Sequence, residues 1–124
     1  MCSSDLVTVR GDPRLLRRMV RNLLENATRH GAPPIEVRVS RTEGKAELSV
    51  SDHGPGIPDA EREGVFRPFY RFPDGGERAG AGLGLALVRQ IARRHGGDAR
   101  YLGREQSGGS FIVTLEASTH GGVS

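Results

Sequence analysis

The sequence predicts an α/β (α+β) fold, a two-layer sandwich in which a mixed, mostly antiparallel sheet is covered on one face by helices. Three observations predict it: two amphipathic helix patterns, two hairpins of short alternating strands, and the order β-α-β-β-loop-α-β-β along the chain. Strands joined by short connections pair antiparallel, and the apolar face of their sheet needs helices to cover it. A chain of 124 residues supplies one core and therefore one domain.

The first elements are a short strand and a long helix. Residues 6–12 (LVTVRGD) alternate apolar and polar side chains before a turn. Asp12 followed by Pro13 is a typical helix N-cap with proline at the first helical position. The helix is predicted over 13–30 and ends at Gly31, with an apolar stripe for the sheet formed by Leu16, Met19, Val20, Leu23 and Ala27.

The remaining elements are two hairpins with a second helix between them. Each hairpin strand alternates apolar and polar residues, and the second helix carries apolar residues at helical spacing. The strands are predicted at residues 35–41, 46–52, 98–103 and 110–117, and the second helix from near Leu83 to His95-Gly96-Gly97.

Composition argues against several other classes of protein. The net charge of +3 is spread along the chain, without the focused basic patch that a nucleic-acid-binding module needs. Cys2 is the only cysteine, so no disulfide framework forms, which fits a reducing compartment. No 18-residue apolar run or signal peptide is present. We therefore expect a soluble, cytoplasmic chain, although a larger parent protein could be anchored in the inner membrane.

The first helix carries an unusual polar stripe. With Asn22 at zero and about 100° per residue, Asn26 lies near about +40°, Arg29 near about −20° and Glu25 near about −60°. Asparagine is a mediocre helix former, so two on one face need a reason. Amide oxygens suit Mg²⁺, and a guanidinium suits phosphate. The helix alone does not decide between such a site and a stripe that simply faces solvent.

Two glycine motifs flank the remaining elements. In DHGPGIP, Asp52 ends a strand as an acceptor for a donor such as an exocyclic amine, and Gly54 and Gly56 permit a tight turn and close approach of a ligand. In GAGLGL (80–85), glycines at a helix start expose amides that suit phosphate, although the motif fits neither a P-loop nor the Rossmann spacing. A plain Asp-Gly turn and a flexible linker are the alternative interpretations.

These pieces in this order resemble the catalytic ATP-binding domain of bacterial two-component sensor histidine kinases, a Bergerat-fold (HATPase_c) ATPase related to gyrase and mismatch-repair proteins. The resemblance covers about Leu6 to Glu116. Its four motifs are NLLENATRHG (the N box), DHGPGIP (the G1 box), FRPFYRF (the F box) and GAGLGLALVRQIARRHGG (the G2 box). The resemblance implies an ATP-binding domain at residues 6–116 with a flexible lid at about 59–82, an N-terminal extension at 1–5 and a disordered tail at 117–124.

The resemblance also implies roles for single residues. Asn26 would be the principal Mg²⁺ ligand, supported by Asn22, while Arg29 contacts phosphate and His30 lies beside the nucleotide. Asp52 would accept from the adenine amino group. Gly54, Gly56 and Ile57 would form the wall of the adenine pocket. The phosphates would be held at the start of the second helix by Gly80, Gly82, Leu83, Gly84 and Leu85. Phe66 and Phe69 would anchor the lid, and Arg71 or Arg78 would reach the γ-phosphate. Glu25 receives no firm role.

The family's phosphoacceptor histidine lies in a separate dimerisation domain, next to Glu or Asp. None of His30, His53, His95 and His120 has that setting. We therefore expect a monomeric catalytic fragment that uses ATP and Mg²⁺, whose partners are a dimerisation/phosphoacceptor domain and, downstream, a response regulator. The alternatives are an anti-sigma-factor serine kinase of the same superfamily and a non-catalytic nucleotide-binding regulatory module.

Overall fold

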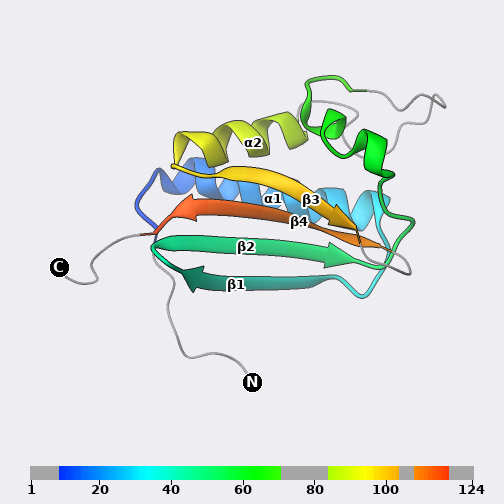
Figure 1. The fold of residues 1–124 in the computed structure, drawn as a ribbon, viewed down its shortest axis with the longest axis horizontal. Helices are drawn as coiled ribbons and strands as arrows, with labels where there is room; N and C mark the ends of the chain where they lie inside the picture. Colours follow the sequence, from blue (N-terminus) through cyan, green and yellow to red (C-terminus); the bar gives the residue numbers. More distant parts are fainter. Residues whose placement is uncertain (1–8, 71–83, 104–107, 118–124) are drawn as a thin grey trace.

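The computed structural model describes residues 9–70, 84–103 and 108–117. Within them the chain forms two α-helices, two short 3₁₀ turns and four strands (Figure 1). In chain order these are α1 (Pro13–His30), β1 (Glu36–Thr42), β2 (Lys45–Asp52), η1 (Asp59–Glu61), η2 (Gly64–Phe66), α2 (Gly84–Arg94), β3 (Asp98–Gly103) and β4 (Gly109–Glu116).

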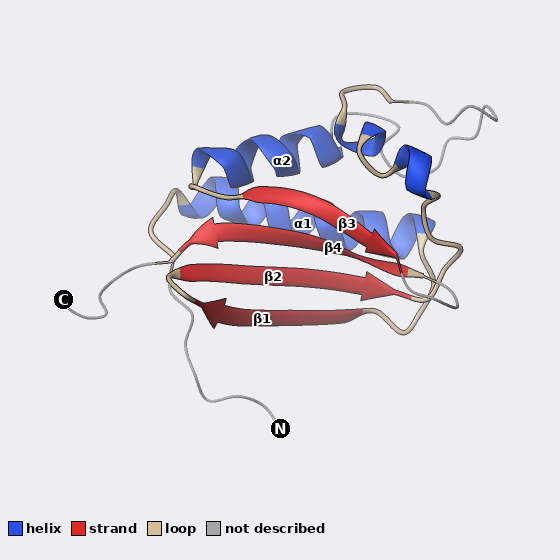
Figure 2. Ribbon diagram, viewed as in Figure 1, coloured by secondary structure: helices blue, strands red, loops and turns tan. Residues whose placement is uncertain are grey.

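The described strands form one sheet in the order β1-β2-β4-β3, and each neighbouring pair is antiparallel. Both helices lie on the same face of this sheet (Figure 2). The two-layer α/β sandwich and both predicted hairpins are therefore confirmed, with strand ends that differ from the predicted ones by at most one residue. The second helix begins at Gly84, next to its predicted start.

The predicted first strand is only partly observed. Residues 6–8 lie outside the described residues, and Val9 forms a single antiparallel bridge with Ala117. Ala117 is buried. The bridge attaches the start of the described chain to the end of β4.

Helix α1 begins as the sequence predicts, because the Asp12 carboxylate accepts a hydrogen bond from the Arg14 amide at 2.9 Å. Its end has a different cause from the expected one. Gly31 has φ −102°, an extended conformation open to other residues, so no left-handed C-cap requires glycine here. The requirement is spatial, since a Cβ at Gly31 would lie 2.6 Å from Asp52 Oδ1 and 2.7 Å from Ala27 O.

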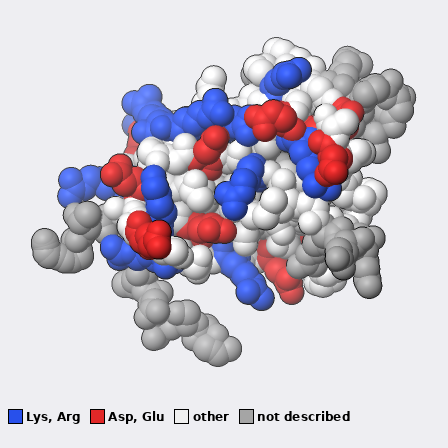
Figure 3. Space-filling view, viewed as in Figure 1, with Lys and Arg blue, Asp and Glu red and all other residues white. Residues whose placement is uncertain are grey.

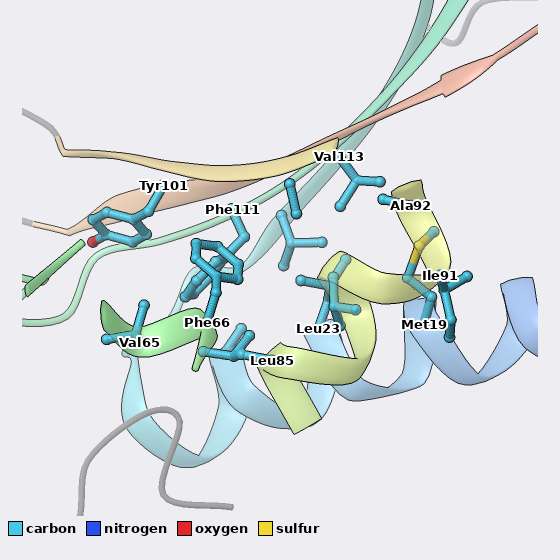
Figure 4. Close-up of a cluster of buried hydrophobic side chains, with 14 of the residues drawn as sticks. Met19, Leu23, Val65, Phe66, Leu85, Ile91, Ala92, Tyr101, Phe111 and Val113 are labelled. Carbon is cyan, nitrogen blue, oxygen red and sulfur yellow. The ribbon is translucent and has the colours of Figure 1, made fainter. Parts of the chain in front are cut away.

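The core lies between the helices and the sheet (Figure 4). Met19 and Leu23 of α1 and Leu85 and Val88 of α2 are fully or almost fully buried. At the end of the molecule that carries Asp52, the core is aromatic: the Phe111 ring centroid lies 4.9 Å from that of Tyr101 and 6.0 Å from that of Phe66, both edge-to-face. Within the described residues, no helix is both long and apolar enough to cross a membrane.

Candidate functional site

Asp52 is a buried carboxylate at the carboxyl end of β2, only 7% exposed. Its Oδ1 accepts a hydrogen bond of 2.6 Å from the Gly54 amide, which turns the chain sharply after the strand. The described residues supply Oδ2 with no hydrogen bond. An ionised carboxylate only accepts hydrogen bonds, so this side chain can accept from a ligand donor.

Two glycines allow the backbone to pack closely around this carboxylate. Gly31 packs directly on Asp52, and a Cβ at Gly54 would lie 2.9 Å from the Gly31 Cα atom. The end of α1 and the turn after β2 therefore approach with no side chain between them, and the His53 amide donates to Ala32 O at 2.9 Å across the same junction. Gly56 is required for another reason, a φ of +80°.

The polar stripe of α1 reaches the start of the second helix. Asn22 Nδ2 donates to the Gly84 carbonyl at 3.3 Å, which leaves the amide oxygen of Asn22 as an acceptor. Asn26 and His30 are half-buried, whereas Arg29 is exposed. Burial, and then the positive charge of Arg29, lowers the pKa of His30 below 6.5. The stripe thus borders a partly buried region where it meets α2.

The predicted glycine-loop residues are only partly described. Gly80, Gly82 and Leu83 lie outside the described residues, as do Arg71 and Arg78. Gly84 is exposed at the first position of α2. Leu85 is 2% exposed and its side chain belongs to the core, so only its backbone can face a ligand.

Sequence reasoning missed two side chains that hold the Gly54–Ile57 turn in place. Ile57 is buried as expected, and its carbonyl accepts from Arg62 Nε at 2.9 Å. The Arg62 guanidinium carbon lies 5.5 Å from the centroid of the Tyr101 ring, a cation–π contact. Burial, and then the negative charge of Asp52, raises the pKa of Tyr101. No local pattern in the sequence marks either residue, because the contact between Arg62 and Tyr101 joins residues 39 apart in the chain.

The F box is anchored by one of its two predicted phenylalanines. Phe66 is 4% exposed and packs against Phe111, whereas Phe69 is 68% exposed and does not anchor the segment. Phe69 also adopts a positive φ of 57°, which is uncommon for a residue with a side chain.

His95 and His53 are held by backbone groups. His95 Nδ1 lies 2.8 Å from the Ile91 carbonyl and therefore donates, while its Nε2 accepts from the Asp12 amide at 3.2 Å. His53 Nδ1 lies 3.1 Å from the Pro34 carbonyl. His120 lies outside the described residues. No group of three or more His, Cys, Asp or Glu side chains that could hold a metal ion occurs in the described part of the chain.

Charges of both signs are interspersed on the outer face of the sheet, and no patch of a single sign dominates this view (Figure 3). A nucleic-acid backbone selects concentrated positive charge. This face therefore has the character of an ordinary solvated surface.

The buried carboxylate and the glycine junction lie at one end of the sheet, and the amide stripe of α1 meets the start of α2. Similarity to known proteins assigns the family of the chain. Residues 11–119 match the family described as "Histidine kinase-, DNA gyrase B-, and HSP90-like ATPase" (HATPase_c). The chain belongs to this family.

Among curated proteins, the chain is 46% identical over 114 residues to the signal transduction histidine-protein kinase/phosphatase MprB of Mycobacterium sp. (strain KMS), covering 86% of this chain and 22% of that protein. It is 39% identical over 114 residues to the adaptive-response sensory kinase SasA of Synechococcus sp. (strain JA-3-3Ab), covering 90% of this chain and 30% of that protein. The chain thus spans less than a third of the length of these relatives.

Solved structures agree in fold. The mycobacterial sensor histidine kinase MprB superposes with a TM-score of 0.77 at 37% identity, covering 88% of this chain and 76% of that one. The ATP binding domain of PrrB from Mycobacterium tuberculosis gives 0.76 at 30% identity over 95% and 78% of the two chains. Full-length ShkA in complex with AMPPNP gives 0.78 at 28% identity over 92% and 24%.

Proposed function

We propose that this chain binds Mg·ATP and presents the γ-phosphate for transfer to a histidine on a separate dimerisation/phosphoacceptor domain, in two-component signal transduction. The residues and partners of this activity are part of the proposal. MprB is named a signal transduction histidine-protein kinase/phosphatase, SasA is named a sensory kinase, and the ShkA structure carries the ATP analogue AMPPNP.

The single observation that carries the proposal is the Asp52 carboxylate beneath the Gly31–Gly54 junction. Oδ1 accepts from the Gly54 amide and the other oxygen is left for a ligand donor, while a Cβ on Gly31 would collide with the carboxylate. An ionised carboxylate accepts and cannot donate, so it selects a base that offers an amino group there. Adenine has such a group where guanine has a carbonyl, so this contact favours ATP over GTP. Gly54, Gly56 and Ile57 would form the wall beside the ring.

The phosphate end of the proposal rests on α1 and the first turn of α2. The amide oxygens of Asn26 and Asn22 fit Mg²⁺, a hard cation that keeps phosphate and water as its other ligands. Arg29 would contact phosphate, His30 would lie beside the nucleotide, and Gly80, Gly82, Leu83, Gly84 and Leu85 would contribute backbone amides at the helix start. Bound Mg²⁺ would neutralise phosphate charge; the chain itself contributes positioning and hydrogen-bond donors.

The acceptor histidine would come from another domain, because the described histidines are engaged with backbone groups or lie in the N box. The downstream partner would be a response regulator, and the site of action cytoplasmic. In the proposed domain organisation, residues 6–116 form the catalytic unit with the lid at about 59–82.

The proposal is tested with calorimetry and phosphotransfer. Wild type is expected to bind ATP more tightly with Mg²⁺ than without it. Asn26→Ala is expected to lose this Mg²⁺-dependent gain in ATP affinity. Thr28→Ala, at an exposed position on the same helix, is the matched control and should keep the gain. Asp52→Asn adds an amide donor against the adenine amine and is expected to lower ATP affinity. Absence of any nucleotide binding by wild type would remove the proposal.

Labelled ATP and a purified dimerisation domain supplied in trans test the reaction itself. The proposal expects an acid-labile phosphohistidine on that domain. An acid-stable phosphoserine on a partner would instead support the anti-sigma-factor serine kinase, and binding without any transfer would support the non-catalytic regulatory module.

A further inference from the structure

We infer that Arg89 of α2 is a positioning residue, which fixes the F-box turn η2 onto the helix that begins at the proposed phosphate site. This inference rests on the proposed function for its consequence, but its structural basis does not depend on a nucleotide. Arg89 lies in the middle of α2, and its side chain is only 13% exposed.

The Arg89 guanidinium joins three parts of the chain. Its carbon lies 4.3 Å from the centroid of the Phe66 ring, and its Nη1 makes an ion pair with the Glu63 carboxylate. Its Nη2 donates to the Ala99 carbonyl of β3 at 2.8 Å. The Nε atom lies 3.2 Å from Asp98 Oδ1, a charge contact outside hydrogen-bond geometry.

These contacts require arginine rather than a simple positive charge. A guanidinium is planar, so it can stack on Phe66 while its separate nitrogens address Glu63 and the Ala99 carbonyl. A lysine ammonium is a point charge that reaches one of these partners at a time. The hydrogen bond from Arg89 is the largest cause that lowers the pKa of Glu63, so the pair is charged at neutral pH.

Phe66 is consequently held from two sides, by Phe111 of the sheet and by Arg89 of α2. Figure 4 shows Phe66 beside Phe111 and Leu85 at this end of the core. The same helix receives the Asn22 hydrogen bond at Gly84, five residues before Arg89. The F-box turn and the proposed phosphate site are therefore fixed on one rigid element, and their relative position depends on Arg89.

The test compares Arg89→Met with Arg93→Met. Methionine keeps an unbranched apolar stem and removes the guanidinium. Arg93 lies one turn further along α2 and is 57% exposed, and it shares Asp98 with Arg89 without a described contact to η2. Hydrogen exchange without nucleotide reports on η2 through the amides of Phe66 and Arg67, which donate to Glu63 and Gly64 carbonyls.

For Arg89→Met we expect these two amides to exchange about tenfold faster, with protection in β2 and β4 unchanged. ATP affinity should also fall about tenfold. Both changes correspond to the loss of about one buried cation–π contact. Arg93→Met is expected to change neither quantity more than about twofold, and Arg89→Lys to recover part of both. If Arg89→Met does not fold, Arg89→Lys alone must show the local exchange change.

Unchanged exchange at η2, equal effects of Arg93→Met, loss of protection throughout the sheet, or local loosening with unaltered ATP affinity would each overturn the inference. Failure of wild type to bind ATP would refute the proposed function instead, and the exchange comparison would still decide whether Arg89 anchors the turn.

Discussion

Replacing Gly31 by alanine tests the construction of the Asp52 site most directly. The backbone at Gly31 is extended, with φ −102° and ψ −160°, so alanine brings no dihedral strain. Its Cβ would lie 2.6 Å from Asp52 Oδ1 and 2.7 Å from Ala27 O, closer than real Cβ atoms approach. The carboxylate must move, because the other contact is helix backbone.

Overpacking of this kind costs about 1–3 kcal/mol. In a domain of this size, that corresponds to a fall in melting temperature of roughly 3–12 °C. Because the displaced group is the proposed adenine acceptor, ATP affinity is expected to fall more than stability alone explains. Differential scanning calorimetry and ATP titration below the melting transition measure the two effects separately.

Gly44→Ala is the matched control. Gly44 lies in the β1–β2 turn with φ +79°, and a Cβ there would meet nothing within 4 Å, so alanine costs about 1 kcal/mol through backbone strain alone. It is expected to lower the melting temperature while leaving ATP affinity unchanged. A Gly31→Ala protein with wild-type stability and affinity, or a Gly44→Ala protein with the same affinity loss, would refute the reasoning.

Three further predictions concern stability. Because the pKa of His30 is lowered in the folded protein, the unfolded chain binds more protons as the pH falls through 6.5, and the free energy of unfolding should decrease from pH 7.5 to 5.5. His30→Gln should make this pH dependence of the unfolding free energy less steep in urea titrations, and an unchanged pH dependence would contradict the prediction. Leu23→Ala, at a fully buried site, should lower the free energy of unfolding by about 2–5 kcal/mol, as measured by urea unfolding. Leu102→Ala, at a half-exposed site, should lower it by less than about 0.5 kcal/mol. Asp12→Ala should lower the melting temperature, whereas Asp12→Asn should have a much smaller effect, because asparagine also caps helix N-termini. Equal falls in melting temperature for the two variants would show that the cap does not contribute to stability.

Local patterns predicted the elements well because their causes are local. The Asp12-Pro13 cap and the alternation in residues 35–41 act within a few residues, and α1 and β1 follow them closely. The end of α1 was placed correctly for a different reason, since Gly31 is needed for contact with Asp52. That contact joins residues 21 apart, which no periodicity reveals.

The side chains that support the site were harder to predict. Arg62 and Arg89 appear in the sequence as two among many arginines, and only the fold brings one onto the Tyr101 ring and the other onto the Phe66 ring. Phe69 shows the opposite error: it belongs to the same motif as Phe66, but a left-handed backbone at Phe69 leaves its ring exposed. Motif membership therefore did not determine burial.

The arrangement of α1 also restricts what ligand the site can take. The middle of the helix meets α2 through the Asn22 hydrogen bond, and its C-terminal end meets Asp52 through Gly31. Nine residues separate these points, about 14 Å at about 1.5 Å per residue. In the proposed site, a free phosphate or an isolated base would engage one of these two points only. A nucleotide with an extended polyphosphate would offer an amino group to Asp52 and anionic oxygens to the region around Asn22. Adenosine and pyrophosphate should therefore each bind far more weakly than ATP, and Asp52→Asn should weaken adenosine without affecting pyrophosphate.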